Sequence, residues 1–147
     1  MKIRKATLAD FLELYDLGLS TKELRVSADE PFMDKDDFKL RIIDKRHVFL
    51  VAEVNKKIVG FICANTKDID KPLKNKYACL VYIAVSPEYR RKNIGTKLYQ
   101  YCINKLKKRA ITYVYAWADA NSKPVQKFLL KENFKAGEKC IWMDKKI

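Results

Sequence analysis

The first part of the chain alternates hydrophobic and polar residues in patterns that predict one strand followed by a helix. Residues Lys2 to Lys5 form a basic, alternating segment that we expect to be a short strand. Thr7 and Asp10 have the spacing of a capping box, in which side chains satisfy backbone amides at a helix start. The apolar positions that follow at helical spacing, and that we expect to form one buried face, are Phe11, Leu12, Tyr15 and Leu19.

A second, shorter helix is predicted from about Asp34. Phe38 and Ile42 are four residues apart, so both side chains would point toward the core from one helix face. The segment between the two helices contains Ser27, Pro31 and several acidic residues, which is typical of a loop.

Three hydrophobic segments then predict the main strands of a sheet. The first two, Val48 to Glu53 and Ile58 to Thr66, are joined at Asn55 and Lys56 and predict an antiparallel hairpin. After a polar connection, Ala78 to Val85 is almost entirely apolar, as expected of a strand covered on both faces. We therefore expect this third strand to lie centrally.

The remainder of the chain predicts two more helices and further strands. The first of these helices has a basic last turn, and its apolar positions are Ile94, Leu98, Cys102 and Leu106. A strand should follow from Ile111 to Ala118. Ser122 precedes a lysine and a proline and is expected to cap the last helix, because proline suits a first helical turn. The inward positions of that helix are Val125, Phe128 and Leu129. Asn133 should end it in the left-handed conformation, and Phe134 to Met143 should supply the final strand or strands.

This order of elements, β-α-α-β-β-β-α-β-α-β, indicates a single α/β domain over residues 1–147 with no linker or repeat. A chain of 147 residues can bury roughly 70% of its unfolded surface in one core. The first residues include no apolar stretch long enough for a signal peptide or a membrane span. We therefore expect a cytoplasmic protein without a membrane partner.

Charge and metal-binding residue types narrow the functional classes only slightly. The formal net charge of +13 would attract polyanions, which include nucleic acids and phosphorylated cofactors, but a lysine-rich solvated surface explains it equally. His47 is the only histidine, and the four cysteines are well separated, so the sequence indicates no metal site. We interpret His47 as structural and the cysteines, Cys63, Cys79, Cys102 and Cys140, as small buried apolar groups.

The segment with the clearest chemical signal joins the apolar strand ending at Val85 to the helix beginning near Ile94. Its core is Arg90-Arg91-Lys92-Asn93-Ile94-Gly95-Thr96. A helix start has free amides and a partial positive charge, so a pyrophosphate can bind there if the backbone curves around it. Gly95 leaves room for close approach, Asn93 tolerates positive φ, and the three preceding cations add charge. The segment therefore predicts an anion-binding loop.

The same segment resembles the motif Gln/Arg-x-x-Gly-x-Gly/Ala of the GNAT family of N-acetyltransferases, with Asn93 in place of the first glycine. The resemblance extends to the opening Ile-Arg-Lys-Ala-Thr-x-x-Asp, to Ile58-Val-Gly-Phe in the hairpin, and to the last helix up to Phe134. It implies the GNAT fold, a mixed and largely antiparallel twisted sheet with a splayed strand pair and about four flanking helices. It also implies acetyl-CoA as cosubstrate, CoA as product and no metal.

The resemblance further implies which residues contact the cofactor. Backbone at Ile83 and Val85 would bind the pantetheine arm like an added strand, and the space beside Ala118 to Ser122 would receive its other side. The residues assigned to cofactor binding in this way are Ile83, Ala84, Val85, Arg90, Arg91, Lys92, Asn93, Ile94, Gly95, Thr96, Asn121, Ser122 and Phe128.

The chain departs from the family in the residues that move protons. Many members have a Tyr in the last helix that protonates the CoA thiolate, and here that position is Leu129. Some members use a Glu on the preceding strand as a base, and here that position is Trp117. Asp119, two residues after Trp117, is a candidate base if the strand continues; Tyr82 and Tyr115 are candidate sources of the missing hydroxyl, although each also fits a packing role.

The expected function is therefore acetyl transfer to a primary amine by direct attack in a ternary complex, with no covalent enzyme intermediate. The acceptor, a small molecule or a peptide, is left open, and the acidic residues Asp29, Glu30, Asp34, Asp36 and Asp37 could attract a cationic amine or serve only as caps and loop residues. Two alternatives remain: an acyl-CoA-binding regulatory protein of the same fold, and a basic nucleic-acid-binding protein, for which no recognition motif is found. Family members often form dimers, so a homodimer is also open.

Overall fold

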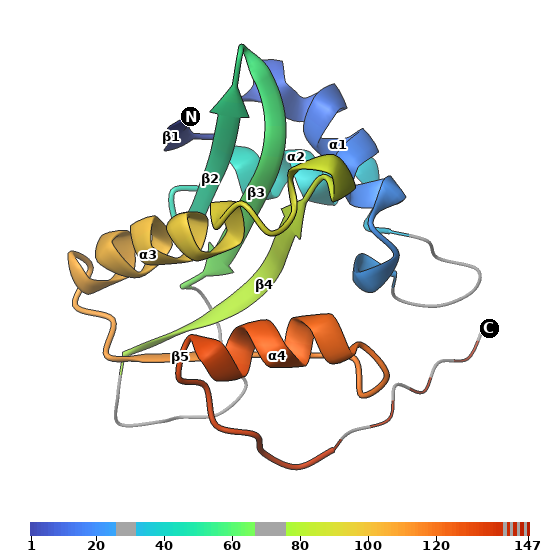
Figure 1. Ribbon diagram of the computed structural model, residues 1–147, viewed down its shortest axis with the longest axis vertical. Coiled ribbons are helices and arrows are strands. Elements are labelled where there is room, and N and C mark those ends of the chain that lie inside the picture. The colour runs from blue at the N-terminus through green and yellow to red at the C-terminus, as the bar shows by residue number, and fades with distance from the viewer. Residues whose placement is uncertain (26–31, 67–75, 140, 142, 144, 146) are drawn as a thin grey trace. The chain divides into compact units, whose positions relative to one another are not determined.

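The structure is a computed structural model that describes residues 1–25, 32–66 and 76–139 and the alternate residues 141, 143, 145 and 147 (Figure 1). Two compact units can be distinguished, Met1–Trp117 and Ala118–Ile147, and each is described by itself. A single domain over residues 1–147 stays a prediction.

The N-terminal unit contains a five-stranded sheet in the order β1-β2-β3-β4-β5. The strands are β1 (Lys2–Lys5), β2 (His47–Val54), β3 (Lys57–Asn65), β4 (Tyr77–Val85) and β5 (Tyr113–Ala116). The helices are α1 (Phe11–Ser20), α2 (Lys35–Ile43) and α3 (Ile94–Lys107), with short 3-10 turns η1 (Leu8–Asp10), η2 (Lys22–Leu24) and η3 (Pro87–Tyr89). All neighbouring strands are antiparallel except β4 and β5, which are parallel. The predicted mixed, largely antiparallel sheet is confirmed.

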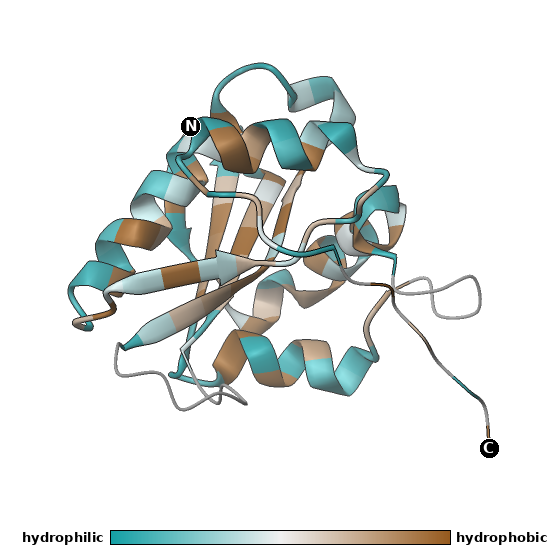
Figure 2. Ribbon diagram, turned by 90° about the horizontal axis from the view of Figure 1, so that it is seen from below, coloured by the Kyte–Doolittle hydropathy of each residue, from teal (hydrophilic) through white to brown (hydrophobic). Residues whose placement is uncertain are grey.

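The helices cover the two faces of this sheet unequally, with α1 and α2 on one face and α3 on the other (Figure 1). Ile94, Leu98, Cys102 and Leu106 are all buried, as their helical spacing predicted. Figure 2 shows hydrophobic residues concentrated along the strands between these helices. β2 and β3 are nearly continuously buried, because helices cover both of their faces and strands flank both of their edges.

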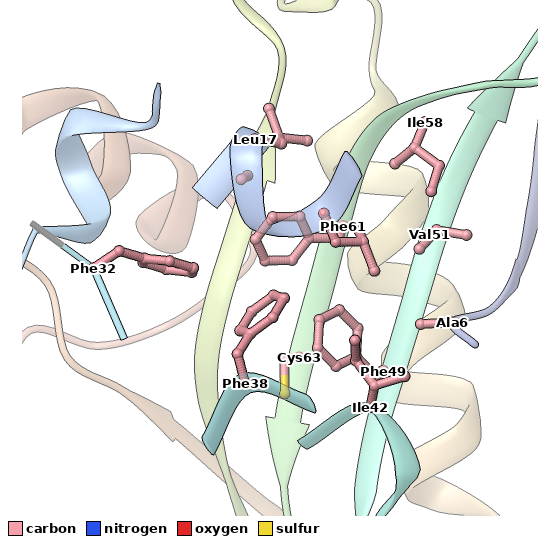
Figure 3. Packing of buried hydrophobic residues seen from close by; sticks show 12 residues of the cluster. Ala6, Leu17, Phe32, Phe38, Ile42, Phe49, Val51, Ile58, Phe61 and Cys63 are labelled. Atoms are coloured by element: carbon pink, nitrogen blue, oxygen red, sulfur yellow. The ribbon is translucent and has the colours of Figure 1, made fainter. Parts of the chain in front are cut away.

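The core on the α1–α2 face is built around aromatic rings (Figure 3). Phe38 from α2 is fully buried, and its ring lies 5.5 Å from Phe49 and 6.1 Å from Phe61 in edge-on arrangements. Edge-on pairs add about 0.5–1.5 kcal/mol to the free energy gained from burial alone. Phe38 therefore ties α2 to β2 and β3, and the predicted inward positions of α2, Phe38 and Ile42, are confirmed.

The buried face of α1 differs from the one predicted. Leu12 is 72% exposed and Leu19 is 36% exposed, whereas Leu14 and Leu17 are buried. The capping residues Thr7 and Asp10 lead first into η1, and the α-helix begins only at Phe11; the side of α1 that faces the core carries Leu14, Leu17 and Gly18. The expectation that Leu12 and Leu19 belong to the core was wrong.

The predicted hairpin is present, but the apolar strand does not lie at the predicted central position. Asn55 and Lys56 both have positive φ, 50° and 64°, as a two-residue hairpin turn requires, so the predicted hairpin is confirmed. The central strand, however, is β3, and β4 lies fourth in the order. In the second half of β4 only Ala84 is buried, because β5 pairs with its first half alone.

The C-terminal unit contains α4 (Lys123–Lys131), which ends as predicted near Asn133 in the left-handed conformation, with φ 65°. The amide of Phe134 donates to the Leu129 carbonyl at 3.0 Å and closes the helix end. Leu129 is buried, and Val125 and Phe128 are partly buried. The final strand predicted at Phe134 to Met143 is not found in the described residues of that range, of which residues 135–139 are exposed and polar or small rather than alternating.

Candidate functional site

The loop between β4 and α3 has a backbone that alternates in handedness. Arg91 has φ 61°, and Asn93 is left-handed with φ 58° and ψ 16°, while Lys92 between them does not have positive φ. Ile94 then starts a right-handed helix of 14 residues. Successive residues of opposite handedness turn their N–H groups to the same side, which creates a concave site for anions. Asn93 therefore adopts the positive φ that its residue type predicted.

The amides at the end of this loop and the start of α3 take no part in backbone hydrogen bonds within the part of the chain that the structure describes. Among the residues that the structure describes, no amide from Arg91 to Thr96 donates to a backbone carbonyl, and the side chain of Asn93 does not cap the helix. The first amide to donate is that of Lys97, to the Asn93 carbonyl at 3.0 Å. Buried or ligand-facing amides in this state are satisfied only by water or by a bound anion.

The three cations of the loop are used differently from one another. Nε of Arg90 donates to the Val85 carbonyl at 3.0 Å, which ties the loop back to the end of β4. Nη1 of Arg90 also lies 3.4 Å from the Glu23 carboxylate, an exposed contact. Nζ of Lys92 lies 5.0 Å from the centre of the Tyr89 ring. Arg90 is therefore a positioning residue in this structure, and the exposed Arg91 and Lys92 supply charge beside the free amides.

Next to this loop, β4 and β5 separate. Their pairing runs only from Tyr77 with Tyr113 to Leu80 with Ala116. Val81 is an extra residue in β4 relative to β3, because Cys63 pairs with Tyr82 and Ala64 pairs with Leu80. A bulge of this kind bends a strand and increases its twist, so it explains why β4 leaves β5 at this residue.

Beyond the bulge, β4 presents backbone groups to the side that β5 has left. The Ser86 amide donates to the Val59 carbonyl at 2.9 Å, so the amides of alternate residues in this half of β4 face β3. The amides of Ile83 and Val85 consequently face the opposite edge, where no strand of the described sheet is paired. An extended ligand can add to such an edge as a further strand.

Tyr82, a candidate proton donor, lies on β4 directly after the bulge. It is partly buried, its ring lies 5.5 Å from Phe32, and burial raises the pKa of its phenol above the usual value. The hydroxyl is therefore protonated at neutral pH and can donate a proton but cannot act as a base.

Tyr115, a candidate proton donor, and Asp119, a candidate base, each have a hydrogen-bonding neighbour. The Tyr115 hydroxyl is hydrogen bonded to the thiol of Cys79, and its ring meets Trp117 edge-on at 6.5 Å. Asp119 was expected on the same face as Trp117 if the strand continued, but β5 ends at Ala116, so that premise was wrong. The Asp119 carboxylate accepts a hydrogen bond from the Asn121 amide at 2.8 Å, as a turn residue does.

The other predicted cofactor residues of the C-terminal unit lie around the start of α4. Ser122 precedes the helix, but its hydroxyl does not cap it, contrary to expectation, and is buried without a hydrogen-bond partner among the described groups. Asn121 is exposed and Phe128 is partly buried.

Among the acidic residues that could attract a cationic amine, Asp29 and Glu30 lie outside the described residues, whereas Asp34 caps α2 by accepting from the amides of Asp36 and Asp37.

Cysteine and metal chemistry find no support in the described part of the chain. It contains no cluster of three or more His, Cys, Asp or Glu residues around a common point. Burial raises the pKa of the Cys63 and Cys102 thiols to about 12, so neither is an available nucleophile at neutral pH.

No helix in the described residues has the length and apolarity to cross a membrane. The sequence did not single out Arg41 of α2, whose Nη1 lies 3.5 Å from Nε2 of His47 at the start of β2, because nothing in its local pattern distinguishes it from a solvated cation.

Comparisons with known proteins agree with this geometry. The model of the acetyltransferase (GNAT) family matches residues 11–134. An uncharacterised N-acetyltransferase of Methanocaldococcus jannaschii is 31% identical over 141 residues, which are 92% of this chain but 60% of that protein. The chain thus spans about 60% of that relative's length.

Solved structures with the same fold are more distant in sequence. A mutant of a Bacillus halodurans protein superposes with a TM-score of 0.82 at 16% identity, covering 99% of both chains. An aminoglycoside N-acetyltransferase in complex with CoA superposes with a TM-score of 0.78 at 14% identity, covering 99% of this chain and 100% of the other. A transcriptional regulator from Bacillus halodurans has a TM-score of 0.78 at 20% identity, covering 98% of this chain and 99% of the other. At these identities the likeness establishes the fold alone.

Proposed function

The chain belongs to the acetyltransferase (GNAT) family, and from this premise we propose that it is an N-acetyltransferase that moves the acetyl group of acetyl-CoA to a primary amine. The observation that supports this most directly is the row of amides from Arg91 to Thr96 at the start of α3, which donate to no backbone carbonyl of the described residues. A diphosphate would satisfy these amides and would be favoured by the helix dipole and by the adjacent cations. The relative named as an N-acetyltransferase supports the same reaction.

In this proposal the separated half of β4 holds the rest of the cofactor. The outward-facing amides of Ile83 and Val85 and the carbonyl of Ile83 bind the pantetheine arm, with Ala84 between them packed in the core. The Val85 amide donates to the thioester oxygen as negative charge develops there. Arg90 occupies the Val85 carbonyl and so helps to keep this end of the strand in place.

The chain's own groups then have to hold and move protons. Tyr82 is the best placed of the candidate donors, because its phenol keeps its proton at neutral pH and it lies in the separated half of β4. Tyr115 remains a second candidate, and Asp119 a candidate base, although its carboxylate is engaged by the Asn121 amide. The amine attacks the thioester directly, without an acyl intermediate on the described cysteines, and positioning supplies much of the rate enhancement.

Calorimetric titration with acetyl-CoA, followed by thiol release across a panel of amines, tests this function. We expect saturable binding with one site per chain and thiol release that depends on an added amine. Absence of acetyl-CoA binding would contradict the proposal outright.

A second function is favoured by a specific observation. Leu129 stands where many family members have a proton-donating Tyr, and Trp117 stands where some have a basic Glu, which is the pattern expected of an acyl-CoA-binding regulatory protein. That function predicts acetyl-CoA binding without thiol release from any amine. The same two measurements therefore separate the alternatives, and neither function requires nucleic acid.

A further inference from the structure

Several side chains near the β4–β5 separation lie on the α1–α2 face of the sheet. Cys63 of β3 belongs to the core on that face, and Tyr82 pairs with it. Cys79 pairs with Asn65, two residues further along β3, and Tyr115 pairs with Cys79. Because side chains of paired residues point to the same side, Tyr82, Cys79 and Tyr115 share the α1–α2 face.

Aromatic rings make up most of this surface along β5. The ring of Tyr115 lies 6.2 Å from Tyr77 and 6.5 Å from Trp117. Trp117 is 71% exposed and Tyr113, on the same side of β5, is 52% exposed. Large aromatic side chains that stay exposed beside a candidate site are typical of surfaces that bind the apolar part of a ligand.

Arg41 is a cation of α2, the helix that covers this face of the sheet together with α1 (Figure 1). Arg41 is partly buried; its Nε donates to the Met33 sulfur at 3.1 Å, and its Nη1 lies 3.5 Å from Nε2 of His47. It is close enough to β3 and β4 to favour the ionised forms of Cys63, Cys79 and Tyr82. His47, which Nη1 of Arg41 contacts, pairs with Asn65, and Asn65 pairs with Cys79, so the Arg41 guanidinium lies at the row of side chains on this face that continues to Cys79 and Tyr115.

The charge of Arg41 is not balanced within the described protein. No carboxylate among the described residues forms an ion pair with it. Its two contacts are a thioether and an imidazole whose pKa is lowered, first by burial and then by Arg41 itself, so both neighbours are neutral at neutral pH. A partly desolvated guanidinium with only neutral partners favours an anionic ligand, and its fork matches a carboxylate.

We propose that Arg41 binds a carboxylate of the acceptor, and that the acceptor is an aromatic or apolar amino acid or short peptide with a free amino group. The aromatic side chains of β5 pack against the apolar part, and the amine is directed toward the separated end of β4. This proposal rests on the proposed acetyl transfer. It excludes polycationic acceptors such as polyamines and aminoglycosides as preferred substrates, because Arg41 would repel them.

Steady-state thiol release with phenylalanine, phenylalaninamide and spermidine tests this proposal. The wild-type protein should prefer phenylalanine to its amide. Arg41→Gln should raise the KM for phenylalanine about 10- to 100-fold, the effect of losing a hydrogen-bonded charge, and leave the KM for the amide and kcat nearly unchanged. Arg41→Lys should recover part of the loss. Equal effects on the acid and the amide, or a preference for spermidine, would overturn the proposal.

Matched controls distinguish the loss of carboxylate binding by Arg41 from unfolding of the variant and from failure of the proposed acetyl transfer. Lys39→Gln removes another cation from α2, one that pairs with Asp36 at 3.0 Å, and should leave both KM values unchanged. Urea denaturation shows whether Arg41→Gln is folded. Should no amine be acetylated, the wider function fails, and calorimetric titration of the CoA complex with phenylalanine and its amide still tests Arg41. Binding that does not favour the acid would then contradict the proposal.

Discussion

At the scale of single residues, the anion loop depends on Asn93 and Gly95 for different reasons. Asn93 holds the left-handed conformation that reverses the chain before α3. Gly95 is in the first turn of the helix and does not need positive φ, so what it contributes is the absence of a side chain near the free amides. The first residue shapes the site and the second leaves it open.

Substitution of Gly95 tests access to the amides. Gly95→Glu should reduce acetyl-CoA affinity at least about 100-fold, because it adds bulk and a negative charge where a diphosphate would bind, and like charges in such a place cost several kcal/mol. Calorimetry measures the affinity. Gly137→Glu, at a position where an added Cβ meets no atom within 4 Å, makes the same chemical change elsewhere and should bind acetyl-CoA as the wild type does.

Substitution of Asn93 tests the backbone conformation. Asn93→Val should destabilise the fold by about 1–2 kcal/mol and weaken acetyl-CoA binding, because a β-branched residue resists positive φ. Asn93→Gly restores the first glycine of the family motif and should bind at least as well as the wild type. Chemical denaturation and calorimetry check both variants, and a Val variant equal to the Gly variant would disprove the requirement.

At the scale of elements, side chains that lie far apart in the sequence hold β1 in place. Arg4 on β1 donates to Asp10 at 2.8 Å and to Glu53 on β2 at 2.9 Å. The Asp10 carboxylate also accepts from the amide and hydroxyl of Thr7 at 2.8 and 2.9 Å. The capping pair predicted from the sequence is thus also the link between η1 and the edge of the sheet, which local spacing could not indicate.

This link predicts a specific dependence of stability on pH. Hydrogen bonding to Arg4, with a further contribution from Thr7, lowers the pKa of Asp10 from 3.8 to about 2. A lowered pKa stabilises the folded state above the unfolded value, and this stabilisation is lost as pH falls from about 4 to about 2. Asp10→Asn should therefore cost about 1 kcal/mol at pH 6, allowing for solvent screening, and progressively less toward pH 2. Urea denaturation across this range measures the difference, and a constant difference would contradict the assignment.

The elements themselves were largely predictable, because the hydrophobic periodicity of each is local. The hairpin turn at Asn55 and Lys56, the buried positions of α3 and the left-handed end of α4 at Asn133 all followed from residue type and spacing. The errors concern relations between elements. Leu12 is exposed because the buried side of α1 carries Leu14, Leu17 and Gly18, and β4 is not central because β3 has two strands on each side in the described sheet.

At the scale of the whole molecule, the net charge of +13 makes long-range attraction of anions unavoidable but unspecific. The separate question is whether a bound anion is held by that field or by the loop amides. Salt distinguishes the two, because the Debye length falls from about 10 Å at 0.1 M to about 3 Å at 1 M, whereas directional hydrogen bonds at short range persist.

Acetyl-CoA affinity should therefore fall by less than about tenfold between 50 and 200 mM NaCl. Binding of duplex DNA through 6 to 10 phosphate contacts would lose about 10³- to 10⁵-fold over the same range. Calorimetry with acetyl-CoA and fluorescence anisotropy with a labelled duplex measure the two responses. A steep salt dependence for acetyl-CoA would indicate that the surface charge, rather than the loop, holds it.

The sequence by itself determined the class of fold, and it predicted the anion-binding loop from Arg90 to Thr96 and the absence of the usual acid and base at Leu129 and Trp117, because each depends on residue types within a short stretch. Only the tertiary structure decided that β4 leaves β5 at Val81, and that Arg41 stands without a carboxylate partner near Tyr82 among the described residues. The physical reason is that strand pairing and the balancing of a charge are set by groups distant in the chain, which local patterns do not relate to one another.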